Sequence, residues 1–140
     1  MSLLSRKGLL AIAAVVDVAV NGREQPVSAR KLAARHDLPP RHLEPVLQAL
    51  VHEGIFQGLR GPRGGYQLSR DRKRISVADI LRAAESVEEG EAAMPKSKIL
   101  SAVVLPAIAD AERSFGALLA RLTVEELARR AEGLAERTAR

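Results

Sequence analysis

The fold is decided by residues 40–70, which read PRHLEPVLQALVHEGIFQGLRGPRGGYQLSR. Their first part predicts a helix over about 41–53, since the apolar residues recur at three- and four-residue spacing: Leu43, Val46, Leu47 and Leu50. Two short strands are expected over 55–59 and 66–70, on either side of a glycine-rich tip at 61–65. A helix followed directly by a basic β-hairpin is typical of the second half of a winged helix-turn-helix unit.

The residues around this stretch supply the remaining helices of such a unit. Apolar side chains from Leu3 to Val20 recur with a helical period, and Asn21-Gly22 is a plausible end for that helix. Ser28 is expected to cap a short helix over 29–36, and Ser76-Val77-Ala78-Asp79 is a capping box that opens a helix to about residue 84. We therefore expect residues 1–84 to form a winged helix-turn-helix DNA-binding domain.

The rest of the chain predicts an acidic loop over 85–98 and two helices over 99–140. The first helix spans about 99–122 and has a broad apolar stripe, which could face both its own domain and a second copy of the chain: Val103, Val104, Ala107, Ile108, Ala111, Phe115, Leu118, Leu119 and Leu122. Packing on its own subunit alone is the alternative. Thr123-Val124-Glu125-Glu126 is a second capping box, which opens a last helix. The expected fold class is mainly α with a small β-hairpin wing and a long C-terminal dimerisation helix.

The charge of the chain is unevenly distributed. The net charge of the 140 residues is +5. Residues 1–83 hold 14 basic and 7 acidic side chains, a net +7, and the remainder carries a net −2. This asymmetry indicates that the front half meets a polyanion, although charge alone fits a solubility pattern equally well. With three aromatic residues in the whole chain, a base-stacking platform for single-stranded nucleic acid is excluded.

Candidate DNA-binding residues gather on the helix pair and the hairpin. The polar face of the second helix carries residue types that suit base edges, namely Arg41, His42, Glu44 and Gln48. The start of the first helix of the pair adds Ser28 and Arg30. The hairpin adds a tip that can approach a narrow minor groove, Arg60, Gly61, Pro62, Arg63 and Gly64, and a phosphate-directed cluster that includes Arg70 and Arg72. Any one of these residues alone would be read as a solvated side chain, so the prediction depends on their clustering.

The sequence resembles a known family at these positions. The stretch Leu59-Arg60-Gly61-Pro62-Arg63-Gly64-Gly65-Tyr66 looks like the wing of the Rrf-two (Rrf2) family of bacterial winged helix-turn-helix transcription regulators, and residues 5–11 are similar to the family's first helix. The resemblance implies a homodimer on a roughly palindromic operator. It also implies base contacts from Arg41 and Glu44, a minor-groove role for residues 60–63, and a long helix that pairs across the dimer axis.

The chain departs from the cluster-binding members of that family, which include an iron–sulfur cluster regulator. Those members carry cysteines in the loop before the long helix, whereas this sequence contains no cysteine at all. It therefore resembles the branch that lacks cluster-ligating cysteines, and no cofactor and no metal site are expected. Glutamates between 85 and 91 could in principle hold a metal through oxygen, but a solvated loop is the favoured interpretation. The effector is left open as a protein or a small molecule, with any pocket expected between the winged domain and the long helix.

The predicted function is a sequence-specific transcription regulator of double-stranded DNA, expected to be a repressor. Catalysis is not expected, because His36, His42 and His52 do not share a helix face and no serine has an evident histidine–acid pair. The apolar run over 9–20 is interrupted by Asp17 and is too short for a membrane span, so a cytoplasmic protein without membrane contact is expected. A protein-interaction adaptor, in which the winged domain or the acidic loop docks a protein partner, is the alternative.

Overall fold

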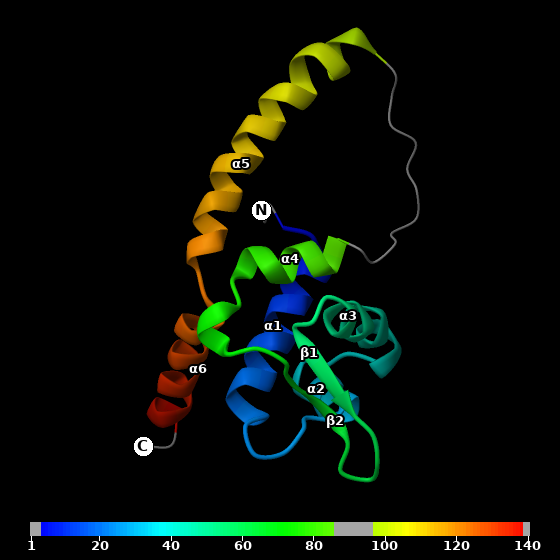
Figure 1. The fold of residues 1–140 in the computed structure, drawn as a ribbon, viewed down its shortest axis with the longest axis vertical. Coiled ribbons are helices and arrows are strands. Elements are labelled where there is room, and N and C mark those ends of the chain that lie inside the picture. The colour runs from blue at the N-terminus through cyan, green and yellow to red at the C-terminus, as the bar shows by residue number, and fades with distance from the viewer. Residues whose placement is uncertain (1–3, 86–96, 139–140) are drawn as a thin grey trace.

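The structure is a computed structural model of the 140-residue chain, and it describes residues 4–85 and 97–138. Its order of elements is α1 (Arg6–Asn21), α2 (Ala29–Arg35), α3 (Pro40–His52), β1 (Phe56–Leu59), β2 (Gly65–Leu68), the 3-10 turn η1 (Arg72–Arg74), α4 (Val77–Glu85), the π-helical turn η2 (Leu100–Val104), α5 (Leu105–Arg121) and α6 (Val124–Thr138) (Figure 1). The mainly helical winged helix-turn-helix fold with a long C-terminal helix is confirmed. Most of the acidic segment expected over 85–98 lies outside the described residues.

The helix starts follow the capping signals of the sequence. Ser76 and Asp79 form a reciprocal capping box, in which the Ser76 amide donates to Asp79 over 3.0 Å and the Asp79 amide donates to Ser76 over 3.1 Å. Thr123 caps α6 by accepting from the Glu126 amide at 3.2 Å. The first helix begins at Arg6 rather than at Leu3, because the Ser5 hydroxyl accepts the Gly8 amide and so fixes the first turn there.

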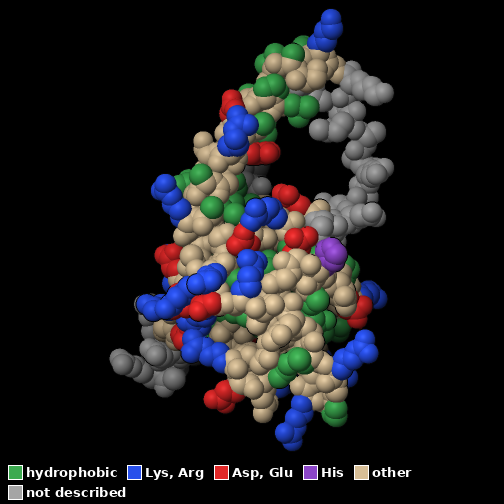
Figure 2. All heavy atoms as spheres, viewed as in Figure 1, with side chains coloured by type: hydrophobic (Ala, Val, Ile, Leu, Met, Phe, Trp, Pro, Cys, Tyr) green, Lys and Arg blue, Asp and Glu red, His purple; other side chains and the backbone are tan. Residues whose placement is uncertain are grey.

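The long helix α5 projects from the body of the molecule and divides the predicted apolar stripe between two surroundings (Figure 1). Phe115, Leu119 and Leu122 are partly buried on the side where α5 packs against α4. The other members of the stripe are exposed: Val103, Val104, Ala107, Ile108, Ala111 and Leu118. Figure 2 shows hydrophobic side chains along the projecting helix. The stripe therefore has an inner part that contacts its own subunit and an outer part that does not.

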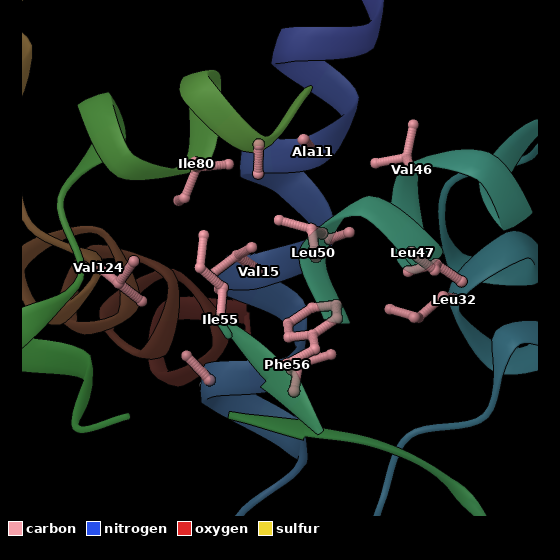
Figure 3. Close-up of a cluster of buried hydrophobic side chains, with 14 of the residues drawn as sticks. Ala11, Val15, Leu32, Val46, Leu47, Leu50, Ile55, Phe56, Ile80 and Val124 are labelled. Atoms are coloured by element: carbon pink, nitrogen blue, oxygen red, sulfur yellow. The ribbon is translucent and has the colours of Figure 1, made fainter. Parts of the chain in front are cut away.

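The hydrophobic core lies between α1, the helix pair and the hairpin, and it extends to the last helix (Figure 3). Val15, Leu47 and Phe56 are among its fully buried side chains, and Val124 and Ala128 of α6 belong to the same cluster. The C-terminal helix thus completes the core of the winged domain, although the sequence had grouped it with the dimerisation helix over 99–140. The periodicity of a helix shows which face is buried, but it does not show which neighbour covers that face.

A short antiparallel bridge fastens the end of α5 to the body. The Val77 amide donates to the Leu122 carbonyl over 2.8 Å, and the Val124 amide donates to the Ile75 carbonyl over 2.9 Å. The link between α5 and α6 is therefore hydrogen-bonded to the segment that joins the hairpin to α4.

Candidate nucleic-acid interface

The second helix of the pair presents the predicted base-reading residues to solvent. Pro40 occupies the first turn of α3, where its missing N–H has no helical partner to lose. The helix buries Leu43, Val46, Leu47, Ala49 and Leu50 against the core. Its opposite face leaves four polar side chains exposed, Arg41, His42, Glu44 and Gln48. The structure thus places the four predicted residues on the solvent-exposed face of α3, opposite its buried face.

The first helix of the pair is held in place by a buried carboxylate that the sequence reasoning did not assign. Asp17 of α1, with a side chain only 6% exposed, accepts from Arg35 Nε at 2.8 Å and from Arg35 Nη2 at 2.7 Å. It also accepts from Asn21 Nδ2 at 3.1 Å, and His36 Nε2 lies 3.0 Å from it. Burial opposes the charge of Asp17, but the hydrogen bonds from Arg35 and Asn21 outweigh it and lower the pKa of this carboxyl. The signal was a single acid within an apolar run.

This anchor fixes the end of α2 and leaves its start open to solvent. At that start, the Ser28 hydroxyl accepts from the Lys31 amide at 3.1 Å and so caps the helix, while Arg30 is exposed. The start of α2 therefore carries a half-buried capping serine and an exposed arginine two residues later.

The wing is a two-stranded antiparallel hairpin in which Phe56 pairs with Leu68 and Leu59 pairs with Gly65. A third segment joins it, since Val27 and Tyr66 exchange two backbone hydrogen bonds of 3.0 and 2.8 Å. Gly65 is required at that contact, because its φ is +153° and a Cβ there would lie 2.4 Å from the Val27 carbonyl oxygen. The hairpin is thereby tied directly to the residue before the Ser28 cap.

A groove of about 440 Å³ runs between the helix pair and the wing. Its lining brings together four of the predicted DNA-binding residues from three separate elements: Ser28, Gln48, Arg60 and Gly64. Tyr66 also lines it, packed on Phe56 with 5.8 Å between ring centroids. Burial and the negative charge of Glu44 raise the pKa of Tyr66.

The hairpin tip and the residues after β2 differ in how far they are free to reach DNA. Arg60, Gly61, Pro62 and Arg63 are exposed at the tip, and Arg70 is exposed after the second strand. Arg72 is not free, because its side chain is only 11% exposed and its guanidinium donates to Glu125 and, over 2.7 Å, to Glu132. The hydrogen bonds to Glu125 and Glu132 raise the pKa of Arg72, and the hydrogen bonds that Glu125 accepts from Arg72 and Arg129 lower the pKa of Glu125 to about 2. The expected phosphate role of Arg72 is therefore corrected: this side chain joins the base of the wing to α6.

The described residues contain no group of three or more histidine, aspartate or glutamate side chains arranged to share a metal ion. The sequence itself has no cysteine, so the donor set of this chain does not fit a thiolate-ligated cluster. Among the helices in the described part of the chain, none has the length and apolar character needed to cross a bilayer.

Comparisons with known proteins agree on one family. The model of the family described as "Rrf2: Iron-dependent Transcriptional regulator" matches residues 4–130. The chain is 38% identical over 86 residues to the HTH-type transcriptional regulator IscR of Xenorhabdus nematophila, a match that covers 61% of this chain and 52% of the relative. It is 35% identical over 86 residues to IscR of Escherichia coli O1:K1 / APEC, covering 61% and 53%. The chain thus matches about half the length of these curated relatives.

The solved structures that resemble this chain cover nearly all of it. The structure of T. potens IscR matches with a TM-score of 0.74 and 28% identity, over 95% of this chain and 90% of that one. The structure of CymR, named the global cysteine regulator of B. subtilis, matches with a TM-score of 0.68 and 26% identity, over 91% and 97%. The likeness therefore includes the long helix as well as the winged domain.

Proposed function

Because this chain belongs to the Rrf2 family of transcription regulators, we propose that it is a sequence-specific DNA-binding repressor. In this proposal it acts as a homodimer on a roughly palindromic operator and needs no iron–sulfur cluster. The relatives are named as regulators, which fits a protein that is not an enzyme.

The observation that carries the proposal is the groove between the helix pair and the wing. It places the Ser28 cap, Gln48 of α3 and Arg60 of the wing around one concave surface. In a winged helix-turn-helix, the second helix of the pair enters the major groove while the wing reaches the adjacent backbone or minor groove. We assign base reading to Arg41, His42, Glu44 and Gln48, and we assign backbone or minor-groove contacts to Ser28, Arg30, Arg60, Arg63 and Arg70. Gly61, Pro62 and Gly64 shape the tip that carries these arginines.

The homodimer is supported by the outer part of the α5 stripe. Val103 and Ile108 are 62% and 50% exposed on the helix that projects from the body, and a contiguous row of exposed apolar side chains is typical of an interaction surface. A two-fold dimer would present two winged domains to the DNA, which is why a roughly palindromic operator is proposed. Phe115, Leu119 and Leu122 would contribute indirectly, because they pack α5 against α4 and so hold the exposed stripe in position.

Regulation without a cluster is supported by the ligand chemistry of the chain. Iron–sulfur clusters are held by cysteine thiolates, and the sequence offers none. In this proposal a regulatory signal reaches the protein through another ligand or through a partner protein. Binding of a partner protein is also what the alternative function, a protein-interaction adaptor, would require.

The proposal is tested by selecting bound duplexes from a random pool with the full chain and measuring affinity for the selected duplex and a scrambled one. We expect a selected sequence with two-fold symmetry, bound at least about 1,000-fold more tightly than the scrambled duplex at physiological salt. If three of the assigned arginines in each protomer neutralise one phosphate each, the dimer makes about six phosphate contacts. The slope of log affinity against log salt is then expected to be about −5. Equal affinity for the two duplexes would refute sequence-specific regulation.

A further inference from the structure

A cavity of about 580 Å³ lies between α4 and α5, where the long helix leaves the winged domain. Its volume falls in the range of small-molecule sites. The apolar part of its wall comes from both helices, with Leu81 on α4 and Phe115 and Leu119 on α5. A ligand in this cavity would therefore contact both the winged domain, through α4, and the proposed dimerisation helix α5.

Gly116 leaves one wall of this cavity bare. It lies in the interior of α5, where glycine destabilises a helix relative to alanine. A Cβ built at Gly116 would meet no atom within 4 Å, so packing against a neighbour does not explain the missing side chain. The open space beside the backbone instead enlarges the cavity that Gly116 lines.

The polar part of the wall is predominantly acidic. Asp79 and Arg82 pair with each other, and Asp79 also caps α4 through Ser76. Two further carboxylates line the cavity from opposite walls, Glu85 at the end of α4 and Glu112 on α5. Acidic and basic side chains are interspersed around the place where α5 meets α4 (Figure 2). The charge balance of this wall favours a cation, and the ring of Phe115 offers a cation–π contact.

We propose that the cavity lined by Phe115, Leu119 and the bare Gly116 and flanked by Glu85 and Glu112 binds an organic cation with an apolar body, such as a protonated arylalkylamine. As an effector site the cavity rests on the proposed DNA-binding function. One wall of the cavity, α4, packs on α3, the proposed recognition helix. The other wall, α5, carries the outer apolar stripe of the proposed dimer interface. A ligand held by both walls of the cavity fixes the position of α4 relative to α5. In the proposed dimer it thereby also fixes the distance between the two winged domains.

The test uses three probes with the same apolar body and different charge: 4-phenylbutylamine, 4-phenylbutanol and 4-phenylbutyrate. Binding to the full chain is measured by calorimetry and by NMR shift changes in the absence of DNA. We expect the amine to bind at least 10-fold more tightly than the carboxylate, with the alcohol in between. Equal affinity for amine and carboxylate would overturn the proposal. Because no DNA is present, failure here is distinguishable from failure of the DNA-binding function.

Two variants locate the site. Gly116→Leu fills the cavity from a position with open space, so we expect a folded protein, with an unchanged or higher melting temperature, that binds the amine at least 10-fold more weakly. Gly133→Leu on α6 is the matched control, since a Cβ there also meets no atom within 4 Å and Gly133 does not line the cavity. Wild-type affinity in Gly116→Leu would place the amine elsewhere and refute the site.

The charge preference and the effector role have their own readouts. Glu112→Gln keeps the shape of the wall and removes one carboxylate, so we expect the preference for amine over alcohol to fall at least 3-fold; an unchanged preference would refute the assigned cation recognition. At saturating amine, affinity for the selected duplex is expected to change at least 5-fold in wild type and not in Gly116→Leu. No change in wild type would refute the effector role.

Discussion

Replacing Asp17 by asparagine tests how the helix pair is anchored. The carboxylate accepts from Arg35 on both oxygens, from Asn21 on Oδ1, and has His36 beside Oδ2. An amide can accept on one of its two atoms only. With its nitrogen at the Oδ1 position, the new side chain loses the contacts of Arg35 Nη2 and Asn21; with its nitrogen at the Oδ2 position, it loses the contact of Arg35 Nε, while His36 Nε2 can accept from it in one tautomer. Hydrogen bonds to charged groups contribute about 1.5–3 kcal/mol each. Arg35 is 41% exposed and regains water when released, so we expect a net loss of about 2 kcal/mol in the free energy of unfolding.

The assay is urea unfolding at pH 7 and one fixed protein concentration, since unfolding of a dimer depends on concentration. A loss of about 2 kcal/mol is roughly a 30-fold change in the unfolding equilibrium. Asp110→Asn on α5 is the matched control, because the Asp110–Arg113 pair is also an aspartate–arginine contact but leaves the two side chains 71% and 72% exposed. Exposed pairs of this kind contribute up to about 1 kcal/mol, so the control is expected to stay within about 0.5 kcal/mol of wild type.

The same pair of proteins gives a pH dependence with a defined sign. The pKa of Asp17 in the folded chain is lowered from its ordinary value of 3.8, so the folded state binds fewer protons at this site than the unfolded state. The stabilisation is therefore complete well above pH 3.8 and is lost as the pH falls below it. The difference between wild type and Asp17→Asn should narrow from pH 7 to pH 3. A difference below about 0.5 kcal/mol at pH 7, or one that is the same at both pH values, would refute the reasoning.

Four other variants test the interface and the wing. Arg63→Ala should weaken binding to all duplexes and reduce the magnitude of the salt slope by about 2 for a dimer, and an unchanged slope would remove the wing tip from the contact. Glu44→Ala should cost about 1–3 kcal/mol of base discrimination with little loss of total affinity; uniformly tighter binding to every sequence would contradict a reading role. Ile108→Glu should give monomers in sedimentation, because Ile108 belongs to the outer stripe, and an intact dimer would contradict the proposed surface. Gly65→Ala should destabilise the protein by more than about 1 kcal/mol in urea unfolding, while Gly58→Ala, whose Cβ would meet the Tyr66 ring at 3.9 Å, should cost less.

Local signals in the sequence predicted local structure well. The caps at Ser28, Ser76 and Thr123 all form, since a capping hydrogen bond joins residues three positions apart and needs no knowledge of the rest of the fold. The apolar period of 41–53 likewise identified the buried face of α3. The same reasoning placed the wing, whose glycines and arginines are contiguous in the chain.

Contacts between residues far apart in the sequence could not be predicted from capping motifs or apolar periodicity. Arg72 belongs to a run of basic residues that resembles a phosphate cluster, yet its partners Glu125 and Glu132 lie more than fifty positions away. The division of the α5 stripe also depends on tertiary packing, since Ile108 and Phe115 share one helical period but only Phe115 faces the α4 side. Periodicity specifies a face, whereas the partner of that face is set by the topology of the whole chain.

The correction at Arg72 bears on how a signal could reach the wing. The wing continues into η1, which is joined to α6 through Arg72, and the next segment is hydrogen-bonded to the start of α6 through Ile75 and Val124. The link between α5 and α6 is held by the same bridge, through Val77 and Leu122. The C-terminal end of α5 is thus fixed to the base of the wing by main-chain hydrogen bonds rather than by a free linker. Because this junction is held by main-chain hydrogen bonds, we expect a change in the angle of α5, imposed by the proposed dimer partner or by the proposed ligand, to move the winged domain with it.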